Sequence, residues 1–189
     1  INSVPGSSAT NTLTIKPAVG ANPLITGTSA TALIVLNGAD NVIMDGSNGN
    51  GTNTVCPLVK ATRNLSIINT ATTAASAGVF VSSIVTNPAT NVTIKNAIIQ
   101  SGTGTVATTY GIMAGGATVG SAGFDIDNLT IENNSISRAY NAISVLGSNI
   151  SPNNNDNLIV RLNDIGSNVV ADYVTNRGVE ITFSTGALI

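Results

Sequence analysis

A short phrase recurs five times along the chain: an asparagine, an apolar residue, any residue and a second apolar residue. It reads NVIM at Asn41–Met44, NLSI at Asn64–Ile67, NVTI at Asn91–Ile94, NLTI at Asn128–Ile131 and NLIV at Asn157–Val160. Successive Asn residues of these phrases are 23, 27, 37 and 29 positions apart, a loose period of the length that one solenoid coil needs. Such short units cannot bury an apolar face alone, so we expect them to stack and share one core.

Two further series of strand-like runs accompany the phrase. Longer runs lie between the phrases and alternate between apolar and polar residues after a small one: GVFVSS from Gly78, YGIMAGG from Tyr110, NAISVLGS from Asn141 and RGVEITF from Arg177. Short runs follow the phrase at Ala97–Gln100, Ser135–Ser137 and Asp164–Gly166. The interleaving predicts at least two strands per coil, often with a third, joined by turns.

Asparagine also recurs where the chain should bend between strands. These residues are Asn96, Asn133 with Asn134, and Asn163. Asn tolerates the left-handed backbone conformation that such bends need, and its amide can hydrogen-bond the same group one coil away. We therefore interpret the repeated Asn as structural, not as a ligand-binding feature.

The composition favours an all-β solenoid in one domain, residues 1–189. Hydrophobic residues make up 42% of the chain and charged residues only 8%, against roughly 25% charged residues in ordinary globular proteins. We expect a parallel β-helix of about six to seven coils, with Ile, Val and Leu inside and Thr, Ser and Asn facing water. Loops at Ser101–Thr109, Ala117–Asp127 and Ser148–Asp156 are the expected places for any binding function.

Several classes of function are disfavoured by what the chain lacks. The net charge is −2, so the chain has no basic footprint for nucleic acid or an anionic membrane. Cys56 is the single cysteine, so no disulfide can form within the chain, and we expect a half-buried small hydrophobe there. No run approaches the roughly 20 apolar residues that span a bilayer. The chain has no signal peptide and no initiator Met, so we expect a processed or excised piece of a longer polypeptide.

These runs resemble the right-handed parallel β-helix of the pectin-lyase-like superfold. More narrowly, INSVPGSSATNTLTIKPAVGANPLITG at the start, and ALIVLNGADNVIMDGSNGNGTNT followed by RNLSIINT, are similar to β-helix segments in very large secreted and cell-surface proteins of gliding and other Bacteroidota. The resemblance implies export through the type IX route and display on the surface or in a filament. The C-terminal sorting domain of such proteins is absent here, and no known reaction is implied.

Polysaccharide cleavage is the enzymatic alternative, because many β-helix proteins are lyases or glycosidases. Hydrolysis of a glycosidic bond needs two suitably spaced carboxylates. Asp125 and Asp127 form the only tight acidic pair and would share a face in one strand, with Arg138 as the nearest candidate for a basic partner. Catalysis or Ca²⁺ binding by this pair is one interpretation. The simpler one is that a turn aspartate caps the start of the strand that follows. No other cofactor or metal is expected, because the chain has no His.

Four further patterns have specific interpretations. Arg138, Arg161 and Arg177 would lie on successive coils and could form a basic stripe, whereas Lys95, Glu132 and Arg161 share one offset and predict a solvated ladder of alternating charge. The glycosylation sequons at Asn64, Asn91 and Asn128 are the repeat phrase itself. Thr93 and Thr130 match in the phrase, as an ice-binding face would need, but Ser66, Ile43 and Ile159 interrupt their column.

Taken together, the sequence predicts a non-catalytic structural or adhesive segment of a large secreted or cell-surface bacterial protein. Its expected partners are adjoining segments of the same or a neighbouring protein at both solenoid ends. The alternative is a polysaccharide-binding or polysaccharide-cleaving β-helix domain.

Overall fold

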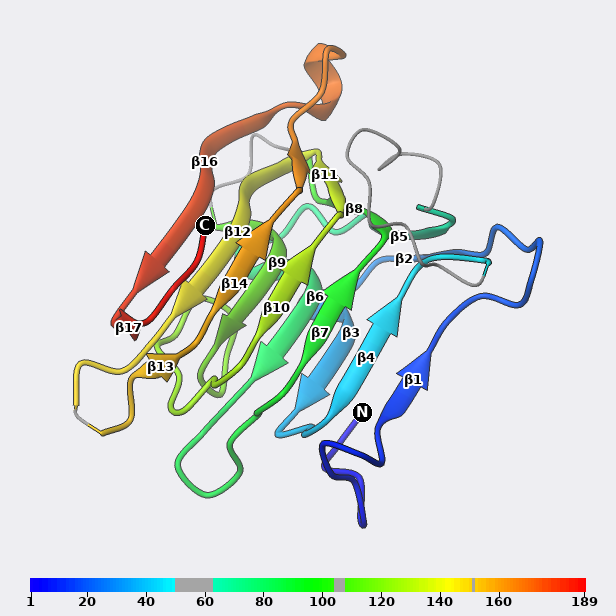
Figure 1. Ribbon diagram of the computed structural model, residues 1–189. Coiled ribbons are helices and arrows are strands. Elements are labelled where there is room, and N and C mark those ends of the chain that lie inside the picture. The colour runs from blue at the N-terminus through cyan, green and yellow to red at the C-terminus, as the bar shows by residue number, and fades with distance from the viewer. Residues whose placement is uncertain (50–62, 104–107, 151) are drawn as a thin grey trace.

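The chain forms a parallel β-solenoid of five coils with three strands in each coil (Figure 1). The structure is a computed structural model and describes residues 1–49, 63–103, 108–150 and 152–189. Each strand pairs in parallel with the equivalent strand of the next coil, so the fifteen strands build three five-stranded sheets. Five layers at the usual strand spacing give a rod core about 20 Å long.

The three sheets follow one another around each coil. The first contains β1 (Leu13–Ile15), β4 (Val42–Asp45), β7 (Thr93–Lys95), β10 (Thr130–Glu132) and β14 (Ile159–Arg161). The second contains β2 (Leu24–Gly27), β5 (Leu65–Asn69), β8 (Ala97–Ser101), β11 (Ser135–Ser137) and β15 (Asp164–Ile165). The third contains β3 (Ala32–Asn37), β6 (Ser76–Ser82), β9 (Thr109–Gly115), β12 (Ala139–Leu146) and β16 (Val174–Thr182).

Three bends connect the sheets. The first bend leads from the third sheet into the first sheet of the next coil, the second bend joins the first and second sheets, and the third bend joins the second and third sheets. A short 3-10 helix, η2 (Val170–Asp172), lies between β15 and β16. At the first bend, β13 (Asn155–Asp156) pairs with β17 (Ser184–Thr185), and Leu188 bridges to Ile159, so the last residues lie as a partial sixth layer on coil five.

The three series of runs predicted from the sequence are the three sheets, with one correction. The phrase at Asn64–Ile67 forms β5 of the second sheet, whereas the other four phrases belong to the first sheet. This phrase therefore does not open a coil of its own. The expected six to seven coils are five, because two phrases, Asn41–Met44 and Asn64–Ile67, fall within the same coil.

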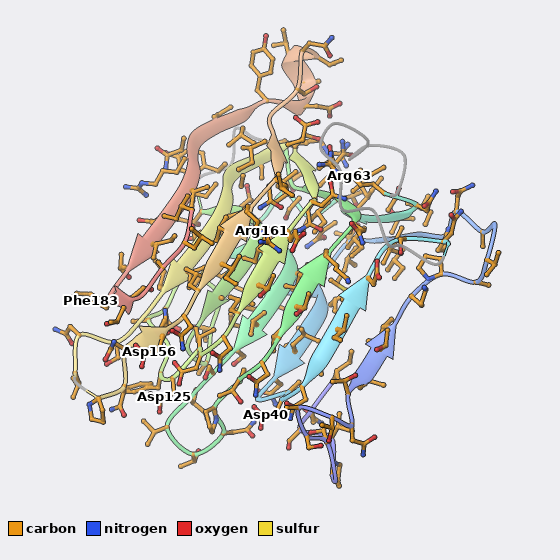
Figure 2. All side chains as sticks on the ribbon, viewed as in Figure 1. Asp40, Arg63, Asp125, Asp156, Arg161 and Phe183 are labelled. Carbon is orange, nitrogen blue, oxygen red and sulfur yellow. The ribbon has the colours of Figure 1, made fainter. Side chains whose placement is uncertain are left out.

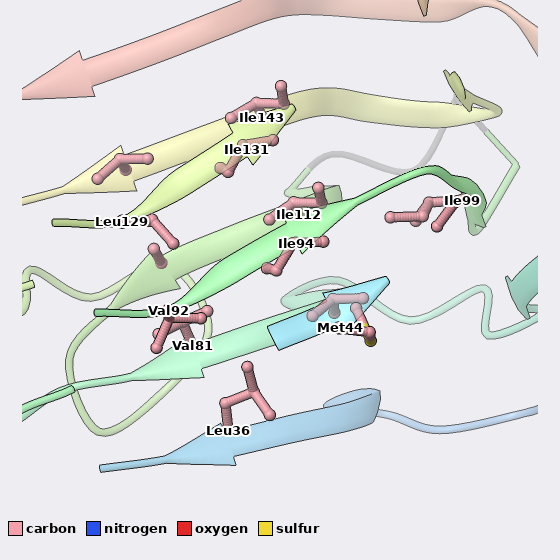
Figure 3. Packing of buried hydrophobic residues seen from close by; sticks show 14 of the residues in the cluster. Leu36, Met44, Val81, Val92, Ile94, Ile99, Ile112, Leu129, Ile131 and Ile143 are labelled. Atoms are coloured by element: carbon pink, nitrogen blue, oxygen red, sulfur yellow. The ribbon is translucent and has the colours of Figure 1, made fainter. Parts of the chain in front are cut away.

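The core consists of aliphatic columns that run through the layers. Val42, Val92, Leu129 and Leu158 stack along the start of the first sheet, and each is fully buried. Figure 3 shows Ile94 and Ile131 of the first sheet opposite Ile112 and Ile143 of the third. Burial of each such side chain contributes about 1.5–3 kcal/mol, so the columns supply the main stabilisation of the solenoid.

Two glycines on the third sheet leave space for isoleucine side chains of the second sheet. A Cβ at Gly78 would lie 2.7 Å from Cγ2 of Ile99, and one at Gly111 would lie 2.4 Å from Cγ2 of Ile136. The third bend is therefore too narrow for a larger residue at this position of β6 and β9. This explains why a glycine stands at the start of the run from Gly78 and in second place in the run from Tyr110.

The outer face of the third sheet differs from the expectation of a polar surface. Phe80, Tyr110 and Met113 point outward but are buried, and Val119 from the loop at 117–127 packs with them in a second apolar cluster. Hydrogen bonds hold this loop down: Gly116 N–H donates to the Ser121 carbonyl, and Gly123 N–H donates to the Leu146 carbonyl. β6 and β9 are consequently buried on both faces.

A column of asparagines at the first bend holds the coils in register. Asn41, Asn91, Asn128 and Asn157 have φ between 55° and 57°, in the left-handed region. The amide nitrogen of each donates to the amide oxygen of the one before it, at 3.2 Å for Asn91, 3.0 Å for Asn128 and 3.2 Å for Asn157. The column thus supplies both the backbone conformation of the bend and a hydrogen bond from every layer to the next.

The second bend has the Asn stack that the sequence predicted. Asn96 and Asn133 have φ of 59° and 53°, and the Asn133 amide donates to Asn96 Oδ1 at 2.6 Å. Asn134 is fully buried, and its amide nitrogen donates to the Ile94 carbonyl at 2.9 Å and to Asn163 Oδ1 at 3.2 Å. These amides satisfy backbone groups that the bend would otherwise leave unpaired inside the core.

The Asn column can be separated into its backbone and side-chain contributions at Asn128. Asn128→Gly keeps access to a positive φ but removes the amide, so we expect the free energy of unfolding to fall by about 1 kcal/mol. Asn128→Ala also removes the amide, and alanine tolerates the left-handed region less well than asparagine or glycine. We therefore expect its loss in the free energy of unfolding to be larger by about 1–2 kcal/mol. Chemical denaturation measures both. Equal losses in the two variants would show that the bend conformation contributes nothing.

Candidate functional site

The acidic pair lies at the first bend of coil four and not in a strand. Asp125 has a positive φ of 48°, and both Asp125 and Asp127 are half-buried in the turn before β10. Figure 2 shows Asp40, Asp125 and Asp156 along the edge where the first-sheet strands begin. The two carboxylates therefore do not share the face of one strand, as the sequence spacing allowed.

Asp127 has a structural partner in the next layer. Its Oδ1 accepts a hydrogen bond from the Asp156 N–H at 2.8 Å. Asp40 does the same two coils earlier, where its Oδ1 accepts from the N–H of Thr90 at 2.7 Å. An Asp before the first-bend Asn thus links coil two to coil three and coil four to coil five, and an Asp directly before the phrase is the signal in the sequence.

Crowding of carboxylates changes the titration of Asp127. Burial raises the pKa of Asp127 above its ordinary value of 3.8, and the charges of Asp156 and Asp125 act in the same direction. The hydrogen bond from the Asp156 backbone opposes them without cancelling the shift. A raised carboxyl pKa is a property of general acids. Here, however, burial and the nearby charges of Asp125 and Asp156 account for the raised pKa without a catalytic role.

Arg138 lies far from the acidic pair. It occupies the third bend with φ of 49°, at the opposite end of β12 from the first bend. Eight strand residues at about 3.3 Å each separate the two bends along the third sheet. The structure therefore does not bring Arg138 together with Asp125 and Asp127. Its Nε and Nη2 atoms are buried without a hydrogen-bond partner.

Metal binding gains no support from the geometry. Within the described residues, no three His, Cys, Asp or Glu side chains lie close enough together to hold a metal ion. Ca²⁺ binding at the acidic pair stays a prediction from the sequence. Cys56 lies outside the described residues.

The predicted charge ladder is present on the first sheet. Lys95, Glu132 and Arg161 are in register, and Asp45 extends the column by one coil. Arg161 Nη2 contacts Glu132 Oε2 at 2.9 Å, and Lys95 Nζ contacts Asp45 Oδ2 at 3.6 Å. Burial alone would raise the pKa of Asp45, but hydrogen bonds from Asn96 and Ser47, together with the Lys95 charge, leave that pKa below its ordinary value.

The three arginines do not form a basic stripe. Arg138 is at the third bend, Arg161 ends β14 of the first sheet, and Arg177 lies in β16 of the third. Arg177 pairs with Glu180 at 3.4 Å instead. A lyase-like base aligned with further cations is therefore not formed by these residues.

Arg63 is a buried cation that the sequence gave no reason to single out. Arg63 directly precedes Asn64 of coil two, and its side chain contacts residues of coils four and five (Figure 2). Nε donates to the Asn133 carbonyl at 2.8 Å, Nη2 donates to the Leu162 carbonyl at 3.3 Å, and Nη1 lies 3.5 Å from Asp164 Oδ2. Burial lowers the pKa of Arg63, and Asp164 opposes that effect. The guanidinium thus links three layers at the second bend.

The sequons and the threonine column have structural explanations. The amide nitrogens of Asn91 and Asn128 donate within the first-bend column, and that of Asn64 donates to Asn22 Oδ1 at 2.8 Å. A glycan on any of them would replace a hydrogen of an amide nitrogen that is engaged in these bonds. The outer column through Thr93 and Thr130 is interrupted by Ile43 and Ile159, so it forms no continuous water-ordering face.

Comparison with protein-family models found no match, and comparisons with curated proteins and with solved structures found none either. Across the described ranges, no helix is long and apolar enough to cross a membrane. The strand pairing establishes the fold as a parallel β-solenoid. Its function has to be argued from the geometry of this chain.

Asp127→Asn tests the structural role of the acidic pair. Because burial raises the folded-state pKa of Asp127, this group favours folding below about pH 3.8 and costs stability as the pH rises through the folded-state pKa. An Asn still accepts the Asp156 N–H but does not titrate. We expect Asp127→Asn to raise the free energy of unfolding at pH 7 by less than about 1 kcal/mol, and the gain to vanish at pH 3.

Asp127→Ala is the matched control, since it also removes the acceptor and should lower stability by about 1 kcal/mol. Denaturant titrations at several pH values measure the series. A loss of stability in Asp127→Asn at pH 7, or a difference independent of pH, would contradict the structural assignment.

Arg63 should matter through its backbone contacts more than through its ion pair. The Asp164 side chain is 42% exposed, whereas that of Arg63 is 2% exposed, so water screens the pair and its net contribution is below about 1 kcal/mol. We expect Arg63→Met to lower the free energy of unfolding by about 1–3 kcal/mol, because the Asn133 and Leu162 carbonyls lose a charged donor. Asp164→Asn should cost less. A larger loss in Asp164→Asn would contradict this ranking.

Proposed function

We propose that the chain is a structural and adhesive β-solenoid segment of a large exported bacterial surface protein, and that it joins end to end with other solenoid segments. The observation that carries the proposal is the state of its two end faces. Each end face combines unpaired strand edges with exposed apolar side chains, whereas the rest of the described residues expose only Val85 and Ile150 among the large apolar side chains.

The strand edges at both ends have hydrogen-bonding groups to offer. β1, β2 and β3 form the outermost layer at one end, and β14, β15 and β16 form it at the other (Figure 1). In the described part of the chain, no further strand lies beyond β2 or β15. An open strand edge is a ready template for pairing with another strand.

Exposed apolar residues are concentrated at the same two ends. The first coil exposes Ile1, Val19, Leu24 and Ile25, and the part from β14 onward exposes Leu162, Val169, Val170, Tyr173, Phe183, Leu188 and Ile189. Among the described residues, the exposed large apolar side chains elsewhere are Val85 and Ile150, both in loops between coils. Exposed apolar side chains gathered at both ends of a solenoid mark those ends as candidate protein–protein interfaces.

Partial extra layers show which register the edges accept. Val160 N–H donates to the Leu188 carbonyl at 2.9 Å, and Leu188 N–H donates to the Leu158 carbonyl at 2.8 Å. At the other end, Asn37 N–H donates to the Ile1 carbonyl at 2.7 Å, with Asn2 paired in parallel to Asn37. Both end layers therefore take a parallel strand in the register of the solenoid, which supports further coils as the partner.

Self-association of the purified chain tests the proposal. We expect sedimentation velocity to show concentration-dependent head-to-tail association, which Ile25→Lys and Leu188→Lys weaken by at least about tenfold. These two side chains are 39% and 55% exposed at opposite ends, so a lysine there places a charge on each end face and disfavours strand pairing across it. Thermal unfolding checks that both variants are folded.

Val85→Lys is the matched control, because Val85 is 65% exposed on a loop between coils. It should associate like the unmodified chain. A chain that stays monomeric at every concentration, or a Val85→Lys variant as impaired as the end variants, would contradict end-to-end joining.

A further inference from the structure

A pocket of about 240 Å³ opens at the first bend, between the last two layers. It lies between the protruding loop that follows β12 and the shorter turn that follows β16. Six residues line it: Ser148, Asn149, Asn154, Phe183, Ser184 and Thr185. The volume is small compared with pockets for drug-sized ligands, so it suits a single ring.

From coil two onward, the position two residues before that of the first-bend Asn points inward, and it changes from apolar to polar in the last two layers. Ala39, Ala89 and Ile126 occupy the position in coils two to four, and all are fully buried. Asn155 and Ser184, which pair with each other in β13 and β17, occupy it in the last two layers. Asn155 Nδ2 and Ser184 Oγ are buried without a hydrogen-bond partner. Of these two residues, Ser184 lines the pocket and Asn155 does not, so one buried hydroxyl without a partner stands at the pocket wall.

Phe183 is held beside the pocket in a conformation that a bulky residue rarely adopts. Its φ is 50°, its carbonyl accepts the Asn155 N–H at 3.0 Å, and its side chain is 55% exposed (Figure 2). Backbone strain of this kind persists only where the surroundings fix it. Phe183 lines the pocket, and its exposed side chain is not part of the core.

The polar groups of the pocket are neutral and have capacity left. The Asn154 amide nitrogen already donates to Asp156 Oδ1 at 3.0 Å and to Thr185 Oγ1 at 2.7 Å, so its oxygen remains as an acceptor. Asn149 is exposed on the loop. None of the six lining residues carries a charge, which disfavours a phosphate or a carboxylate as the ligand.

We propose that this pocket binds one neutral pyranose unit of a glycan, with an apolar C–H face of the sugar on the Phe183 ring and its hydroxyls on the surrounding amides and hydroxyls. Amide oxygens and hydroxyls match the alternating donors and acceptors of sugar hydroxyl groups. This site lies at one end of the solenoid and shares Phe183 with the exposed apolar residues of that end. It is distinct from the acidic pair, and it binds without turnover.

Chemical-shift perturbation of the isotope-labelled chain tests the site. The probes are glucose, galactose, mannose and N-acetylglucosamine, with glucuronate and galacturonate as charged controls. We expect at least one neutral sugar to shift the amides of 148–150, 153–154 and 183–185, and the charged sugars to bind at least about tenfold more weakly. No shift at these amides with any sugar would overturn the proposal and leave ordered water as the partner of the orphaned atoms.

Substitutions at Phe183 separate binding from folding. Phe183→Asn keeps a residue that tolerates positive φ but removes the ring, and it should weaken binding about tenfold, whereas Phe183→Tyr should retain it. Tyr173→Asn is the matched control, because Tyr173 is 41% exposed and lies outside the pocket lining. Thermal unfolding checks that each variant is folded. Equal affinity of Phe183→Asn and Tyr173→Asn would overturn the assignment.

Discussion

The register between neighbouring coils is the constraint on which the whole structure depends. Parallel strands alone would allow one coil to slip against the next, and a slip by one residue would turn every inward Ile and Val toward water. The first bend prevents this because each Asn must take a left-handed conformation and also reach the amide of the layer below. The aliphatic columns then supply most of the energy, but the bends decide which residues enter them. Arg63 adds a longer link of the same kind across three layers.

Much of this architecture could be predicted from sequence because strand alternation and Asn at bends are local signals. The runs from Gly78, Tyr110, Asn141 and Arg177 indeed form one sheet. The phrase at Asn64 was misassigned because an Asn before an alternating strand has the same local pattern in the first and second sheets. Only the pairing of a phrase with strands far away in sequence shows which of the two sheets it joins. A pattern of four residues does not contain that information. The coil count failed for the same reason.

The site residues show where local reasoning ends. Asp125 and Asp127 are close in sequence and stay close in space, but Asp127 is engaged by the next layer and Arg138 is a strand length away. Arg63 could not be found because its partners lie 70 to 101 residues further along the chain. The pocket beside Phe183 forms only where the loop after β12 lies next to the turn after β16 in the following layer. Sequence patterns within one coil do not show that the two segments are neighbours. The loop at 117–127, expected to carry function, instead covers Phe80 and Met113.

The central claim is that stability passes from layer to layer, so that each coil is held by its two neighbours and the end coils by one. Hydrogen exchange of individual backbone amides, measured at a concentration where the chain is monomeric, tests this most directly. The account predicts the slowest exchange in β7, β9, β10 and β12, and progressively faster exchange toward β1 and β2 at one end and β14 and β15 at the other. Equal protection in the end strands and the middle strands, or fast exchange in the middle, would contradict it.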